Sequence, residues 1–135
     1  MKRDPLQRLL VVGWGLLAVS LPLGLTLEAL HALKVPVYLG SALRRELWTL
    51  AHAHANLLAL LCLAFVAVGE RSIADPQRRA SIAKWLAFGA IAMPLGFFLG
   101  GVLNSEGDPS LGVLLVPVGG VALLLALLRA ALSAR

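Results

Sequence analysis

The side chains with the greatest capacity for chemistry are two histidines and an asparagine inside an apolar segment. His52 and His54 are separated by one alanine, and Asn56 follows two residues later. All three belong to a segment that opens at Leu47 and reaches Gly69 without a charged residue. Polar groups are costly in hydrocarbon, so a spanning segment that carries them usually has a use for them. Imidazole can bind a metal, relay a proton or hydrogen-bond to a neighbouring helix.

Four segments with almost no charge must position these side chains. The chain has 135 residues, of which 59% are hydrophobic and only 14% charged, far less polar than a soluble domain. Each segment reaches the roughly 18–20 residues that cross a hydrocarbon core of about 30 Å. We therefore predict an all-α polytopic membrane protein, a four-transmembrane-helix bundle. It forms a single membrane domain over residues 1–135, with spans at about 9–31, 46–69, 82–104 and 110–129.

The basic residues are distributed unevenly among the connections. Nine of the 12 lie before the first span, between the second and third spans, or after the fourth: Lys2, Arg3, Arg8, Arg71, Arg78, Arg79, Lys84, Arg129 and Arg135. The other three are Lys34, Arg44 and Arg45. Because cytoplasmic connections carry the excess of Lys and Arg, we predict an inner-membrane protein with both termini in the cytoplasm. The membrane also accounts for the net charge of +5, and no nucleic acid is expected as a partner.

This topology gathers the polar spanning residues in the outer half of the bilayer. Glu28 and His31 end the first span, and Asn104 ends the third. His52 lies about 8 Å below the start of the second span. A transition metal could be bound by His52, His31 and Glu28, or a haem by two histidines of the first two spans.

Two other interpretations of these residues remain open. His52 and Asn56 could hydrogen-bond across the bundle and hold helices together, while Glu28 and His31 pair near a helix end. Alternatively, chains of Glu and His could conduct protons or a small solute, with a gate at kinks formed by three prolines: Pro22, Pro94 and Pro117.

His52 and His54 cannot bind the same ion from a regular helix. At 100° per residue they point in nearly opposite directions, and His54 falls among leucines. We expect His54 to be an interfacial histidine without a ligand, with contact to a neighbouring subunit or to headgroups as the alternatives.

Small residues indicate which faces pack together. Gly13, Ser20 and Gly24 share one face of the first span, and Gly96 and Gly100 lie on one stripe of the third. Small side chains allow membrane helices to approach closely, so both stripes should face the bundle.

The remaining distinctive residues have simple structural interpretations. Arg44 reads as part of a solvated helix start, and Tyr38 and Trp48 suit an outer aromatic belt. Cys62 is expected to be a packing residue. Since no serine has a histidine at its membrane level and Cys62 lacks a nearby base, an enzyme is not expected.

Residues 47–54 have the sequence Leu-Trp-x-Leu-Ala-His-Ala-His and precede a leucine-rich span. This string resembles small bacterial four-helix membrane proteins of uncharacterised function with His-x-His at the start of their second span. It is also distantly similar to histidine-bearing spans of haem–copper oxidase subunit I. The second likeness would imply haem or copper ligation at His52 or His54, although the predicted third and fourth spans contain no histidine.

These observations favour a small integral membrane protein that acts by association, as a homo-oligomer or an accessory subunit. Its expected centre is an outer polar site formed by His52, His31, Glu28, Asn56 and neighbouring residues. The alternatives are a metal- or haem-binding redox or sensor protein and a small transporter or channel.

Overall fold

The computed structural model describes residues 4–102, 104–105 and 107–134. Lys2, Arg3 and Arg135, which contribute to the predicted orientation, lie outside the described residues. Within the described part, the chain forms five α-helices and one short 3₁₀ helix: α1 (Pro5–Ala32), α2 (Pro36–Leu39), α3 (Ala42–Ser72), α4 (Pro76–Gly101), η1 (Leu111–Leu114) and α5 (Leu115–Ser133).

Four of these segments are long and apolar enough to cross a membrane. They are α1, α3, α4 and the continuous segment of η1 with α5. The prediction of an all-α protein with a four-helix membrane bundle is therefore confirmed. Three helices begin earlier than hydropathy suggests, α1 and α3 by four residues and α4 by six. The starts of α3 and α4 are capped by a side chain: Ser41 accepts a hydrogen bond from the backbone N–H of Arg44, and Asp75 accepts one from that of Gln77.

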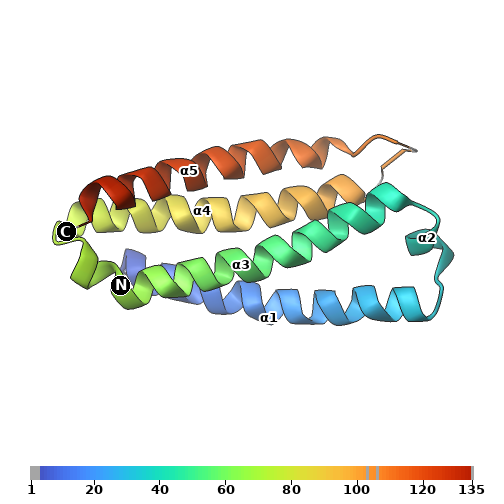
Figure 1. Cartoon of the computed structure of the whole chain (residues 1–135), viewed down its shortest axis with the longest axis horizontal. Helices are drawn as coiled ribbons and strands as arrows, with labels where there is room; N and C mark the ends of the chain where they lie inside the picture. The colour runs from blue at the N-terminus through green and yellow to red at the C-terminus, as the bar shows by residue number, and fades with distance from the viewer. Residues whose placement is uncertain (1–3, 103, 106, 135) are drawn as a thin grey trace.

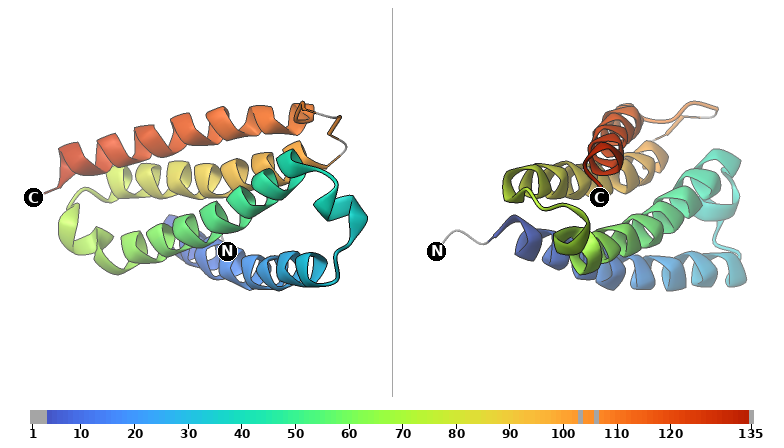
Figure 2. Two further views of the ribbon diagram at one scale, coloured as in Figure 1. Left: turned by 45° about the vertical axis from the view of Figure 1, so that its right-hand side comes forward. Right: turned by 60° about the vertical axis from the view of Figure 1, so that its left-hand side comes forward.

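Successive long helices run antiparallel and pack as neighbours (Figure 1). α1 packs on α3, α3 on α4, and α4 on α5, while α1 also contacts α4. α5 rests mainly on α4, at the edge of the bundle away from α1 (Figure 2). The beginning of α1 and the end of α5 lie at the same end of the bundle (Figure 1). We call this the N-terminal end and the opposite one the loop end, because α2 lies there.

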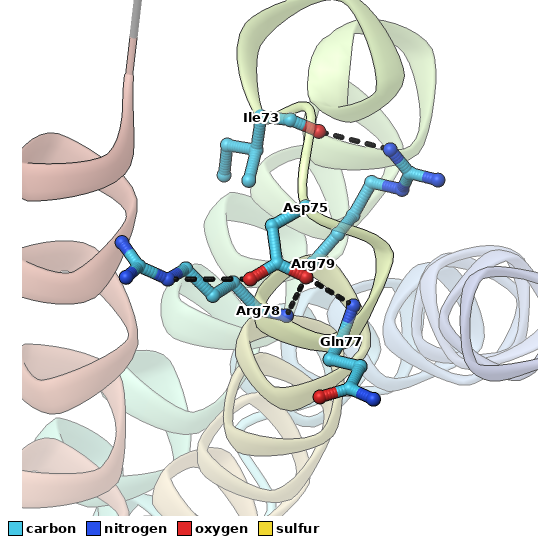
Figure 3. A network of polar contacts seen from close by, with 5 residues as sticks. All are labelled: Ile73, Asp75, Gln77, Arg78 and Arg79. Carbon is cyan, nitrogen blue, oxygen red and sulfur yellow. Dashed lines mark hydrogen bonds and ion pairs between the residues drawn. The ribbon is translucent and has the colours of Figure 1, made fainter.

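The connection between α3 and α4 is much shorter than the predicted polar loop. It consists of residues 73–75, because α3 continues to Ser72 and α4 begins at Pro76. Figure 3 shows how it is fixed: the Asp75 carboxylate accepts hydrogen bonds from the backbone N–H groups of Gln77 (2.8 Å) and Arg78 (3.4 Å). Arg79 donates to the Ile73 carbonyl at 2.9 Å. The polar residues of this region thus extend the helices beyond their apolar parts.

Glycines allow the helices to approach closely, as their stripes predicted. A Cβ atom on Gly13 would lie 2.8 Å from the Leu63 side chain of α3, and one on Gly96 would lie 2.7 Å from the Val116 backbone of α5. Real Cβ atoms do not approach that closely, so a larger residue at either position would separate the helices.

The buried core lies toward the N-terminal end. Leu9 of α1, Cys62 of α3 and Leu86 of α4 are within 1% of complete burial and belong to one apolar cluster. Cys62 is a free, buried thiol, which confirms its interpretation as a packing residue.

The three prolines differ in their helical positions. Pro22 and Pro94 lie inside α1 and α4. Pro117, in contrast, is the third residue of α5, and a backbone N–H in the first turn has no intrahelical partner to lose. Pro117 therefore does not interrupt the hydrogen bonds inside α5 as Pro22 and Pro94 do in their helices. A gate at the three prolines stays a prediction.

Candidate functional site

His52 lies between α3 and α1 and connects them through hydrogen bonds. Its Nδ1 atom is 3.0 Å from the backbone carbonyl oxygen of Ser20 and 3.1 Å from the Ser20 hydroxyl oxygen. The Ser20 hydroxyl in turn donates to the backbone carbonyl of His52 at 3.2 Å. The ring fits against α1 because position 24 is glycine: a Cβ there would be 2.5 Å from the His52 Cε1 atom.

These partners determine which ring nitrogen carries the proton. A carbonyl oxygen can only accept a hydrogen bond, so Nδ1 of His52 must be the donor. At the opposite side of the ring, the Asn56 side-chain amide donates to Nε2 at 3.2 Å, so Nε2 accepts. Both ring nitrogens therefore have hydrogen-bond partners within the chain, Nδ1 as a donor and Nε2 as an acceptor. The geometry supports the interpretation as a group that joins helices for His52, which bonds to α1, whereas Asn56 bonds to His52 within α3.

Ser20 is the residue of this site that the sequence analysis missed. It was assigned to the packing stripe, but no serine was expected at the level of a histidine. Its side chain is 1% exposed. The signal that could have found this pair is the distance of each residue from the loop end. Ser20 lies 12 residues before the end of α1 and His52 lies 10 residues after the start of α3, so the two residues are at similar depths in adjacent antiparallel helices.

The Ser20–His52 contact does not form a nucleophile–base pair. A catalytic histidine must accept the serine proton, whereas Nδ1 of His52 already carries a proton that it donates to the Ser20 carbonyl. The Ser20 hydroxyl donates instead to a backbone carbonyl. This pair is built to hold two helices in register.

Glu28 and His31 lie farther toward the loop end and are exposed. His31 is seven residues beyond Gly24, roughly 10 Å along the α1 axis. Its ring makes an edge-on contact with Tyr38, at 6.4 Å between centroids. Among the described residues, no group of three or more His, Cys, Asp or Glu side chains could hold a metal ion. The structure thus leaves His52 apart from its two predicted co-ligands, and metal or haem binding stays a prediction.

His54 points toward α4 rather than α1. Its Nδ1–H donates to the Leu50 carbonyl one turn earlier, at 2.8 Å, and its ring lies 4.8 Å from the ring of Phe97. The opposite directions predicted for the two histidines are confirmed. His54 contacts α4 within the bundle rather than a neighbouring subunit, and its lack of a ligand stays a prediction.

Asn104 belongs to a second polar cluster, centred on Arg44, at the loop end. The Arg44 guanidinium donates to the Asn104 side-chain oxygen at 2.9 Å and to the Gly101 carbonyl at 2.9 Å, and it also bonds the Val37 carbonyl. It therefore ties the start of α3 to α2, to the end of α4 and to the loop that follows α4. The interpretation of Arg44 as a solvated helix start is wrong. Five donors in a planar fork allow one arginine to serve several acceptors that hydropathy cannot reveal.

The aromatic residues near Arg44 form a stack inside the protein. Tyr38 and Trp48 stack at 6.1 Å, and Trp48 and Phe98 at 5.6 Å. The Trp48 indole N–H donates to the Phe98 carbonyl at 3.1 Å, and Arg44 lies 5.8 Å from the Trp48 ring. Tyr38 is only 4% exposed. The prediction that Tyr38 belongs to a lipid-facing aromatic belt is wrong, because α2 folds it onto α3.

Comparisons with known proteins found no family model, curated protein or solved structure that matches this chain.

The first prediction concerns the two histidines. Replacing His52 with Ala removes the contact that joins α1 to α3 and leaves Asn56 without its acceptor, so we expect a loss of about 1–2 kcal/mol in the free energy of unfolding. His54→Ala, which removes a bond within one helix, is the matched control and should cost less. Reversible unfolding in detergent measures both. Equal losses for the two variants would contradict a central role for His52.

The second prediction concerns Arg44. Arg44→Lys keeps the charge but cannot serve acceptors in three directions, so the loop end should open more often. We expect amide hydrogen exchange in residues 36–40 to accelerate about tenfold or more. Arg71→Lys, at an exposed position at the other end of α3, is the control and should leave exchange unchanged. Unaltered exchange in Arg44→Lys would show that the cluster is not needed to hold α2.

Proposed function

We propose that this chain is a small integral protein of the cell's inner membrane that acts by association, as a homo-oligomer or as an accessory subunit of a larger membrane complex. Its partners in this proposal are the lipid bilayer and other membrane helices. The observation that carries the proposal is that the polar side chains inside the bundle, those of His52, Asn56 and Arg44, serve contacts within the chain, while its outer surface offers apolar helix faces.

The polar groups support this proposal by the way in which they are used. His52 and Asn56 hydrogen-bond to each other, and His52 also bonds α1. Arg44 and Asn104 join connecting segments to helix ends. Among the described residues, no buried side-chain nitrogen or oxygen lacks a hydrogen-bond partner. These groups make the chain a rigid unit, which suits a protein that presents a fixed surface to others.

The two outermost helices supply that surface. In the most apolar part of α4, 44% of residues are buried inside the protein, compared with 17% in α1 and 22% in the segment that contains α5. Leu25 of α1 and Leu124 of α5 are 66% and 56% exposed. A helix held by few neighbours gains packing contacts when a further helix joins it, so both faces are favourable for association.

Metal or haem binding would require His52 to lose one of its hydrogen bonds within the chain. A metal at Nε2 must displace the Asn56 amide, and one at Nδ1 must remove the proton shared with Ser20. Association requires no such change, which is why we place it first.

The third prediction tests association. The protein is extracted in native nanodiscs by a membrane-solubilising polymer, and the mass of the particles is measured by native mass spectrometry. Each particle should contain two or more copies of the chain, or the chain with a fixed set of other subunits. Leu25→Trp or Leu124→Trp should shift the main species to single copies, because a bulky ring disturbs a helix interface. Leu33→Trp, in the connection between α1 and α2 and 77% exposed, is the control. Single copies with lipid alone in the wild type would contradict the proposal.

The fourth prediction tests the orientation. The basic residues favour a cytoplasmic location for both termini, so a cytoplasm-active reporter fused after Arg135 should be active, and the same reporter inserted at Gly107 should not. A reproducible reversal of this pattern would overturn the orientation.

A further inference from the structure

Two cavities follow the line where α1 and α4 lie beside each other. The first, about 650 Å³, lies at the N-terminal end, and Asp4 and Arg8 of α1 and Lys84 of α4 line it. The second, about 310 Å³, lies farther along the same two helices, between Leu16 of α1 and Ile91 of α4. Ala51 and Ala55 of α3 also line the second cavity. We call the two cavities together the α1–α4 groove.

The two cavities lie along the same faces of both helices. Most lining residues of α1 recur every three or four positions, and Ser20 follows directly after Val19: Pro5, Arg8, Val12, Leu16, Val19, Ser20 and Leu23. Those of α4 follow one face in the same way: Ala83, Lys84, Ala87, Ile91, Pro94, Leu95 and Phe98. Positions three and four apart share one face of a helix. The groove therefore leads from a charged mouth at Arg8 and Lys84 to an apolar part at Leu16 and Ile91.

We propose that the α1–α4 groove binds an anionic phospholipid, with the phosphate between Arg8 and Lys84 and one acyl chain along the apolar part. The mouth has the charge that such a headgroup requires. Arg8 and Lys84 are exposed, and in the described part of the chain neither forms an ion pair. Basic pockets between spanning helices at the cytoplasmic side are a recognised setting for anionic lipid headgroups.

The length of the groove suits a lipid better than a free phosphate. Leu16 and Leu23 lie eight and 15 residues beyond Arg8, which is about 12 and 22 Å along the helix. One leaflet of the hydrocarbon core is about 15 Å thick. A lipid whose phosphate lies at Arg8 would thus place its chain beside Leu16 and Ile91, both of which line the apolar cavity.

Asp4 allows a test of the direction in which charge at the mouth changes lipid selectivity. Each basic residue near a headgroup favours an anionic over a zwitterionic lipid by about fivefold, and an acidic residue opposes it by a similar factor. With Arg8, Lys84 and Asp4 at the mouth, the wild type should prefer the anionic lipid by about fivefold. Asp4→Asn should raise the preference about fivefold further, while the Arg8→Gln/Lys84→Gln double variant, in which Asp4 remains, should reverse it to about fivefold in favour of the zwitterionic lipid.

The experiment offers the detergent-purified protein an equimolar mixture of phosphatidylglycerol and phosphatidylcholine with identical acyl chains, and measures bound lipid by native mass spectrometry. The matched control is Arg71→Gln/Arg78→Gln, which removes two charges from the same end of the bundle but not from the groove. Ile91→Trp, which places a ring in the apolar part, should reduce the bound phosphatidylglycerol at least fivefold. Glycerol 3-phosphate, which has the phosphate but no chain, should not displace the lipid.

The proposal stands only if these results agree. No preference in the wild type, or the same loss in both double variants, would mean that general surface charge governs binding and would overturn it. Displacement of the lipid by glycerol 3-phosphate, or undiminished lipid binding in Ile91→Trp, would overturn the proposal that an acyl chain lies in the groove. Because Asp4→Asn should gain selectivity, a failure of that gain cannot be explained by a damaged fold.

Discussion

Helices that cross a bilayer are not pressed together by the hydrophobic effect, because lipid tails are as apolar as leucine. Their relative position depends on close packing and on polar contacts between them. In this chain the decisive contact is the reciprocal pair of hydrogen bonds between Ser20 of α1 and His52 of α3. It fixes the two helices in register at one depth, and Gly24 allows the ring to approach. The N-terminal half of α1 then reaches α4, where Leu9 joins the common core.

A second polar cluster performs the same task at the loop end. Arg44 connects segments that are distant in sequence, namely α2, the end of α4 and Asn104. The aromatic stack of Tyr38, Trp48 and Phe98 lies against it. Together the two clusters explain why a chain with so few polar residues keeps histidine, asparagine and arginine in or beside its spans. Their use inside the protein leaves the outer faces of α1 and α5 apolar and available for lipid or for other helices.

The parts of the fold that depend on hydropathy could be predicted from the sequence. The four spans follow from apolar length, and the packing faces follow from small residues such as Gly13 and Gly96. Helix ends could not be predicted in this way, because Ser41 and Asp75 cap α3 and α4 within polar sequence. The hydrogen-bond partners of His52 and Arg44 could not be predicted for a related reason. Both sets of partners depend on the depth at which residues of separate helices lie beside each other. A span boundary that is wrong by four residues moves a side chain by about one turn and changes its neighbours.

The central claim is that His52 holds α1 and α3 together through hydrogen bonds of its ring. Nitrogen-15 NMR of the protein labelled at histidine tests this most directly, with His52→Ala used to assign the signals. The account predicts a His52 ring with its proton on Nδ1 and none on Nε2. A proton on Nε2, or a metal-shifted Nε2 signal in the protein as isolated from cells, would contradict it.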